Sequence, residues 1–210
     1  MLLKKEVKQA SDVELLTAIL GNKVMAETLL RKAGGSLFAL VQGLPHENGD
    51  LFCAEGSSAY SRDPVIKLQA ACELAARAIT EQLKTRECLT SPGAVRDLLK
   101  LKLAGLPHEV FICIYLDAQH RVISVEEAFR GTLTQTSVYP REIVKAALRS
   151  NAAAVIFAHN HPSGVTQPSQ ADEMLTRSLR EALSLIEVKV LDHFIVAGTS
   201  TLSFAERGLL

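Results

Sequence analysis

The stretch from Ala152 to Asp172, AAAVIFAHNHPSGVTQPSQAD, decides the fold of the C-terminal half of this chain. Its first part, Ala152 to Ala158, is an almost uninterrupted apolar run, which is typical of a strand buried on both faces. Apolar residues with helical spacing then predict a helix over residues 170–185. A buried strand followed directly by a helix indicates an α/β arrangement around one sheet.

The sequence on either side of this stretch predicts further strands and helices. Two regions begin with proline as expected at the first turn of a helix, at Pro92 and at Pro140. Asp117 to His120 forms the turn of a predicted hairpin. The expected strands cover 110–116, 122–129, 188–196 and 201–204. Together these elements predict a mixed sheet flanked by helices, an α/β (α+β) fold.

The N-terminal half has a different, all-helical pattern. Ser11 and Glu14 fit a capping box, and Gly21 can end the helix that follows it. We expect further helices over 23–33, 36–42 and 65–83, with an irregular loop over 43–64. The chain is therefore expected to have a small helical domain (1–87) and a larger domain (88–210), with the boundary near Glu87.

Composition narrows the classes of protein. The 23 basic and 23 acidic side chains balance, and each half is balanced too, which argues against a strong electrostatic footprint for DNA. No apolar run approaches the about 18 residues of a membrane span, and Met1 to Lys8 does not resemble a signal peptide. We expect a cytoplasmic protein whose four separated cysteines are free thiols and which has no membrane partner. The sequence carries no signal for an oligomeric state.

The end of the buried strand carries the candidate metal ligands. His159 and His161 are two residues apart, so in an extended segment both side chains point to the same side. Ser169 is the expected N-cap of the next helix, which places Asp172 in its first turn, facing the strand end. Two histidines and one carboxylate are ligands that zinc prefers, and they leave a fourth position open, as in catalytic zinc sites.

Other readings of single features stay open. A lone His-x-His is more often two structural or surface histidines than a metal site. Asp192-His193 could orient a metal ligand, although a pair that pins its own strand is the favoured interpretation. Arg141-Glu142 could contact a substrate, but a surface ion pair is favoured.

The complete spacing, His159-x-His161, seven residues, Ser169, two residues and Asp172, matches the JAMM (MPN+) metalloprotease motif. The residues around it resemble the RadC (UPF0758) family more narrowly, strongly over residues 89–210 and weakly before them. The stretches that carry this resemblance are Phe129 to Leu133, Pro140 to Ile143, His159 to Gly164, Leu191 to His193 and Ser203 to Gly208.

The resemblance implies a JAB/MPN-like domain that holds one Zn²⁺ per chain through His159, His161 and Asp172. It implies hydrolysis of a peptide or isopeptide amide bond in a peptide or protein substrate. A glutamate would assist attack by zinc-bound water, and Ser169 would stabilise the tetrahedral intermediate. Glu109, before a core strand, is the favoured glutamate; Glu126 and Glu127 are its rivals.

Two departures from the family pattern qualify this expectation. Tyr139 stands where many relatives have histidine, which points to altered substrate preference. The helix-hairpin-helix segment that relatives carry lacks its Gly-x-Gly hairpin in residues 43–64, so DNA binding is disfavoured. The alternatives are a DNA-associated (repair or recombination) protein with a structural or vestigial metal site, a non-catalytic scaffold, and a phosphodiesterase.

Overall fold

The computed structural model describes residues 10–37, 40, 63–85, 92–131 and 138–210. The chain divides into two compact units, Met1–Ala75 and Ala76–Leu210. The dividing point between these units lies inside helix α4 (Asp63–Thr85), whereas the sequence suggested a domain boundary near Glu87. The reason is packing: Ala76 and Leu83 of α4 are buried in the core of the second unit.

The first unit is helical in the part that the structure describes. Helix α1 (Asp12–Leu20) begins with the expected capping box, in which Ser11 and Glu14 bond each other's backbone N–H groups. Helix α2 (Lys23–Lys32) follows after Gly21, which adopts the left-handed conformation at the end of α1. The core of this unit consists of Leu16, Leu20, Ala26, Leu29, Leu40 and Leu68. Most of the helix expected over 36–42 lies outside the described residues.

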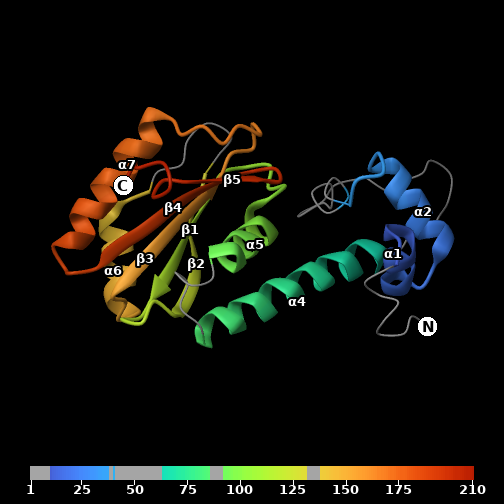
Figure 1. Ribbon diagram of the computed structural model, residues 1–210, viewed down its shortest axis with the longest axis horizontal. Coiled ribbons are helices and arrows are strands. Elements are labelled where there is room, and N and C mark those ends of the chain that lie inside the picture. The colour runs from blue at the N-terminus through green and yellow to red at the C-terminus, as the bar shows by residue number, and fades with distance from the viewer. Residues whose placement is uncertain (1–9, 38–39, 41–62, 86–91, 132–137) are drawn as a thin grey trace. The chain divides into compact units, whose positions relative to one another are not determined.

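The second unit is built on one five-stranded sheet with the order β2-β1-β3-β4-β5 (Figure 1). Only β3 and β4 are parallel among these neighbours; the other pairs are antiparallel, which confirms the predicted mixed sheet. The elements in chain order are α5 (Pro92–Leu103), β1 (Val110–Leu116), β2 (Val122–Arg130), α6 (Pro140–Arg149), β3 (Ala154–Asn160), α7 (Gln170–Ser184), β4 (Lys189–Ala197) and β5 (Ser200–Ser203).

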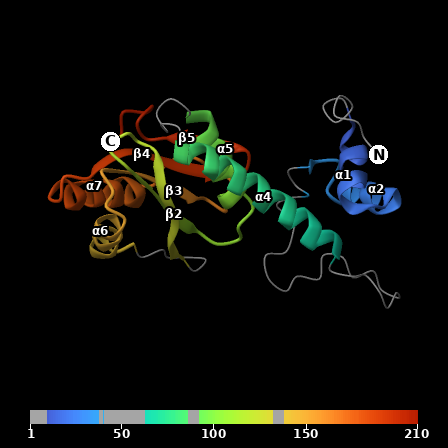
Figure 2. The same ribbon diagram turned by 90° about the horizontal axis from the view of Figure 1, so that it is seen from below.

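Helices cover both faces of this sheet, and each face has its own core (Figure 2). Ile112 and Ile156 face α5 and the end of α4. Phe111 and Phe157, which point the opposite way, face α6 and α7. This burial on both faces explains why β1, and β3 as far as Ala158, are apolar. No helix in the described residues is both long and apolar enough to cross a membrane.

Candidate metal centre

The first two candidate ligands come from the end of β3. The strand runs to Asn160, two residues beyond the predicted end, so His159 lies within it and is buried. The backbone N–H of His161 donates to the carbonyl of Val196 at 2.9 Å, which extends the pairing with β4 by one residue. His159 and His161 therefore both remain in extended backbone, and their rings lie 4.7 Å apart between centroids.

The third candidate ligand comes from the first turn of α7. The Ser169 side chain accepts from the Asp172 N–H at 3.1 Å, and the Asp172 carboxylate accepts from the Ser169 N–H at 2.7 Å, so the predicted N-cap is a complete capping box. The Ser169 hydroxyl also donates to Asp172 Oδ2 at 2.7 Å. These three bonds fix the direction of the carboxylate at the start of the helix.

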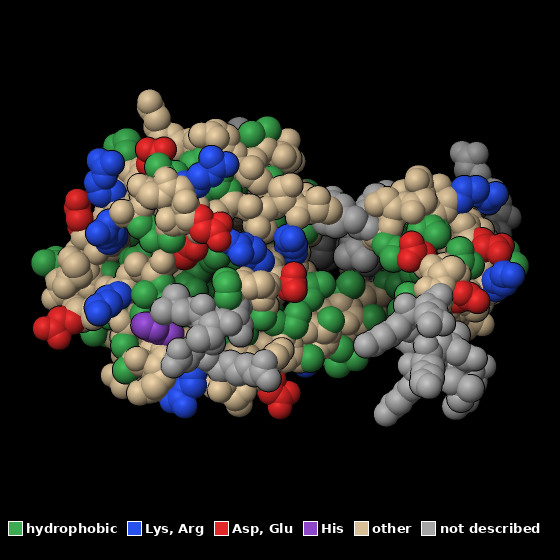
Figure 3. Space-filling model, in the orientation of Figure 1, with side chains coloured by type: hydrophobic (Ala, Val, Ile, Leu, Met, Phe, Trp, Pro, Cys, Tyr) green, Lys and Arg blue, Asp and Glu red, His purple; other side chains and the backbone are tan. Residues whose placement is uncertain are grey.

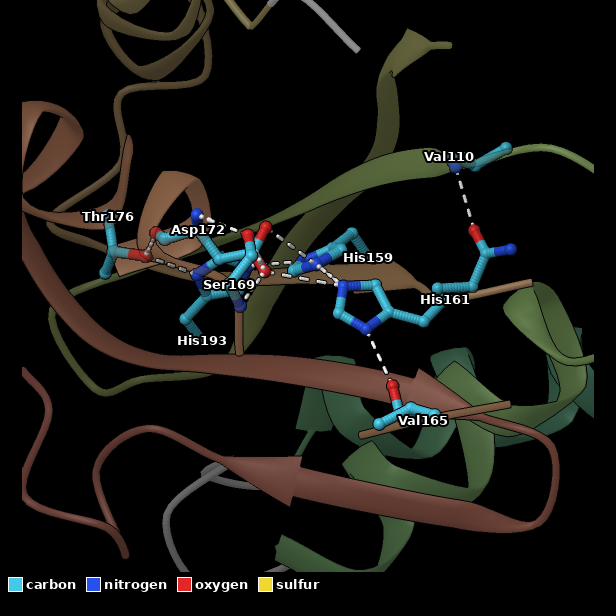
Figure 4. Close-up of polar contacts among 9 residues, drawn as sticks. Val110, His159, His161, Val165, Ser169, Asp172, Thr176 and His193 are labelled. Atoms are coloured by element: carbon cyan, nitrogen blue, oxygen red, sulfur yellow. Dashed lines mark hydrogen bonds and ion pairs between the residues drawn. The ribbon is translucent and has the colours of Figure 1, made fainter. Parts of the chain in front are cut away.

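The three side chains converge on one point (Figure 4). His159 Nε2 lies 2.9 Å from His161 Nε2 and 3.3 Å from Asp172 Oδ1, while His161 Nε2 lies 3.4 Å from Asp172 Oδ2. Ligand atoms at the usual zinc distances and tetrahedral angles are separated by about 3.3 Å. Among the described residues these three form a group that can hold a metal ion.

The donor set also fits a cation. His161 Nδ1 lies 2.7 Å from the carbonyl oxygen of Val165. A carbonyl oxygen only accepts, so Nδ1 carries the hydrogen and Nε2 of a neutral ring presents its lone pair to Asp172 and His159. A carboxylate and lone pairs that meet at one place repel one another unless a proton or a metal ion lies between them.

The charges of the group are coupled. The hydrogen bond that the His161 ring donates to Asp172 raises the pKa of His161 above its usual value, against the opposing effect of burial, and the charge of Glu109 adds to the increase. Burial alone would raise the pKa of Asp172, but the hydrogen bonds from His159 and His161 outweigh it and lower that pKa strongly. Asp172 is therefore ionised whenever the protein is folded near neutral pH.

A second layer of polar side chains lies behind His159. Its Nδ1 is 2.8 Å from Nε2 of His193, and Nδ1 of His193 is 2.6 Å from the Thr176 hydroxyl (Figure 4). His193 is fully buried. The favoured interpretation of Asp192-His193 as a structural pair holds for Asp192, which accepts from Ser203 and from two backbone N–H groups.

The sequence left open that Asp192-His193 orients a metal ligand but favoured the structural interpretation, and the contact of His193 with His159 supports the alternative for His193. Thr176 was not singled out. A signal was present, because His193 interrupts an apolar strand that pairs with β3. The register aligns His193 with Phe157 and places Ile195 opposite His159. Nothing in a single sequence specifies that register.

Glu109 precedes β1, on the side of the metal group. In the antiparallel register Phe111 lies opposite His159, and Glu109 comes two residues before Phe111, at the end of the sheet where His161 follows β3. The Glu109 carbonyl accepts from the N–H of Gly131 at 2.8 Å, so the pairing of β1 with β2 extends to this residue. Its influence on the pKa of His161 agrees with this proximity.

The rival glutamates lie elsewhere. Glu126 is opposite Cys113 on β1, and its carboxylate forms an ion pair with Arg149 at 3.0 Å. Glu127 pairs with Arg130 at 2.8 Å. Arg141 and Glu142 form the surface ion pair that we expected, with the guanidinium largely exposed. The exposed Tyr139 ring packs against Phe129 with 6.0 Å between centroids.

A mixed sheet whose central strand ends in His-x-His, completed by an aspartate from the next helix, is the arrangement of a JAB-type domain with a candidate metal centre. Residues 89–209 match the family described as the RadC-like JAB domain, and the chain belongs to this family. This confirms the resemblance seen in the sequence motifs.

Relatives share nearly the full length of the chain. A UPF0758 protein of Dechloromonas aromatica is 53% identical over 208 residues, covering 95% of this chain and 89% of its own. One from Nitrosomonas eutropha is 50% identical over 217 residues, covering 100% and 93%, and one from Nitrosospira multiformis is 51% identical over 218 residues, covering 100% and 93%. The similarity therefore includes the N-terminal unit, where the motifs alone suggested only a weak resemblance.

Proposed function

We propose that this protein is a zinc-dependent hydrolase that cleaves an amide bond, peptide or isopeptide, in a peptide or protein substrate. The observation that carries the proposal is the convergence of His159, His161 and Asp172, whose ligand atoms lie within 4.8 Å of one another. Three protein ligands leave one tetrahedral position open, which is the arrangement of catalytic rather than structural zinc.

Each residue has a specific task in this proposal. His159, His161 and Asp172 hold the zinc ion, which when bound polarises the substrate carbonyl and lowers the pKa of water toward about 7. Glu109 takes a proton from the attacking water and returns it to the leaving amine. Its position at the end of the sheet that carries His161, together with the effect of its charge on the pKa of His161, supports this choice over Glu126, whose carboxylate is paired with Arg149.

Ser169 has a structural task and a proposed catalytic one. Its hydroxyl donates to Asp172 Oδ2 and so helps to hold a metal ligand. To stabilise an oxyanion, the hydroxyl has to turn its hydrogen from Asp172 toward the substrate. Loss of the hydroxyl in Ser169→Ala is therefore expected to weaken metal binding and also to lower turnover per bound zinc. A purely structural role weakens metal binding and leaves turnover per bound zinc unchanged.

The test begins with the metal content of the purified protein, measured by plasma mass spectrometry. We expect about one zinc per chain, as in a mononuclear site, and its loss in His161→Ala. The matched control is His120→Asn, which removes an imidazole from the β1–β2 turn and keeps a residue that tolerates the positive φ found there. Zinc that disappears in the control as well is not held at this site.

Activity is then screened with peptide and isopeptide substrates, with phosphodiesters alongside them. Cleavage of an amide that requires both zinc and Glu109 supports the proposal. A wild-type protein that takes up no zinc after reconstitution refutes it, and a salt-dependent shift of DNA in a gel would then favour the DNA-associated alternative. On the face drawn in Figure 3, basic and acidic side chains of the second unit are interspersed, which favours the hydrolase.

A further inference from the structure

We propose that His193 and Thr176 are positioning residues that hold His159 in the one tautomer able to bind a metal ion through Nε2. The side chains of His159, His193 and Thr176 and the backbone carbonyl of Asp172 form a continuous series of hydrogen bonds that links two of the metal ligands. This inference rests on the proposed metal site, but it does not depend on the bond that the enzyme cleaves.

Thr176 decides which group donates in each hydrogen bond of this series. Its hydroxyl lies 2.6 Å from the backbone carbonyl of Asp172, one turn earlier in α7. The carbonyl can only accept, so the single hydroxyl hydrogen points at Asp172. The same oxygen lies 2.6 Å from His193 Nδ1 and has only lone pairs left to offer there. His193 must therefore carry its hydrogen on Nδ1.

The direction then passes through His193 to the metal ligand. The His193 ring is fully buried and packs against three aromatic rings, those of Phe111, Phe157 and Phe204, surroundings that favour an uncharged imidazole. With its hydrogen on Nδ1, the neutral ring has a bare Nε2, which lies 2.8 Å from Nδ1 of His159. His159 consequently donates from Nδ1.

This hydrogen-bond direction determines the state of the other ring nitrogen of His159, Nε2. With its hydrogen on Nδ1, a neutral His159 presents a lone pair on Nε2, 2.9 Å from His161 Nε2 and 3.3 Å from Asp172 Oδ1. Val165 fixes His161 in the same tautomer through its own carbonyl. Both imidazoles are therefore prepared for metal before it arrives, one by a backbone carbonyl and one by a relay of two side chains.

Removing the Thr176 hydroxyl tests this relay. Valine has nearly the same shape but accepts no hydrogen bond, so His193 becomes free to carry its hydrogen on Nε2 and donate to His159. His159 Nδ1 then accepts, its hydrogen moves to Nε2, and that hydrogen blocks the metal. Thr176→Ser restores the hydroxyl. Thr80→Val is the matched control, because Thr80 also donates to the carbonyl one turn earlier, that of Ala76, in a helix remote from the ligands.

Two measurements decide the matter. The dissociation constant for zinc, from competition with a chelator, is expected to rise about 10- to 100-fold in Thr176→Val, to return toward wild type in Thr176→Ser and to stay unchanged in Thr80→Val. Imidazole ¹⁵N spectra of the metal-free protein at about pH 8, above the usual histidine pKa of about 6.5, report the tautomers directly. We expect Nδ1–H on His159 and His193 in the wild type, and Nε2–H appearing on both in Thr176→Val.

The outcomes separate this inference from the proposed function. Zinc affinity and tautomers that are the same in Thr176→Val and wild type overturn the relay and leave the hydrolase proposal standing. A wild-type protein that binds no zinc refutes the proposed function. The spectra of the metal-free protein then show by themselves whether Thr176 and His193 set the tautomer of His159. A His159 with its hydrogen on Nε2 in the wild type contradicts the relay in every case.

Discussion

The side-chain oxygen of Asn160 accepts a hydrogen bond from the backbone N–H of Val110 at 2.8 Å. The amide nitrogen of the same side chain donates to the carbonyl of His108 at 2.9 Å and lies 3.4 Å from that of Leu106. Asn160 lies between the two candidate histidine ligands in the sequence. Its side chain bonds the backbone of His108 and of Val110, the residues on either side of Glu109. One side chain thus fixes the candidate metal ligands and the candidate glutamate relative to each other.

Replacing the Asn160 side chain should leave the metal ligands in place but free Glu109 from its fixed position. In Asn160→Ala the buried N–H of Val110 loses its partner, which costs about 1–3 kcal/mol of unfolding free energy, measured by urea denaturation. Zinc content should stay at the wild-type level, because both histidines remain, while turnover falls as Glu109 loses its fixed position. Unchanged stability and turnover would show that water replaces the amide and that the hydrogen bonds of Asn160 do not position Glu109.

The two glutamates should respond differently to the same conservative change. Glu109→Gln should retain zinc and lower turnover by about 10²- to 10⁴-fold, since the amide cannot accept the proton. Glu126→Gln should leave turnover intact and change stability by less than about 1 kcal/mol, because its partner in the ion pair, Arg149, is largely exposed. The opposite result would transfer the catalytic role to Glu126.

The metal-free protein should lose stability as the pH rises above neutral. Asp172 raises the pKa of His161 in the folded state, so the stabilisation is complete below the unfolded value of about 6.5 and is lost as the pH rises through the folded value. Melting temperatures in the presence of a chelator should therefore fall as the pH rises above about 6.5, and less so in His161→Ala. Zinc competes with this proton, so its affinity should increase over the same range. Equal pH profiles for the two proteins would contradict the coupling.

Cys113 should be inert in the folded protein. Burial in β1 raises the pKa of its thiol to about 12, because the ionised form cannot be solvated there. Alkylation at about pH 9, followed by peptide mass spectrometry, should modify the half-buried Cys72 well before Cys113. Since the unfolded thiol ionises near about 8.5, stability should also decline as the pH rises above that value. Rapid labelling of Cys113 under native conditions would show that the sheet opens locally.

The sequence predicts most of the second unit because its central strands β1 and β3 are buried on both faces and its helices α5, α6 and α7 begin with a proline or follow a serine cap. The ligand set is also predictable, since His159, His161 and Asp172 lie in one strand–loop–helix segment whose local geometry places them together. His193 and Asn160 are different, because their partners lie 34 and 50 residues away along the chain. Such contacts depend on the strand order and the register, which a single sequence does not specify.

The division of the chain within α4 has a practical consequence for making the protein. The family match begins at residue 89, whereas the compact unit begins at Ala76. A fragment that starts at residue 89 lacks Ala76 and Leu83, so part of the apolar face beneath α5 would meet solvent. Such a fragment should aggregate during expression, while one that includes all of α4 should be recovered as a monodisperse species by light scattering. In this protein, the segment that matches the family is therefore shorter than the segment expected to fold alone.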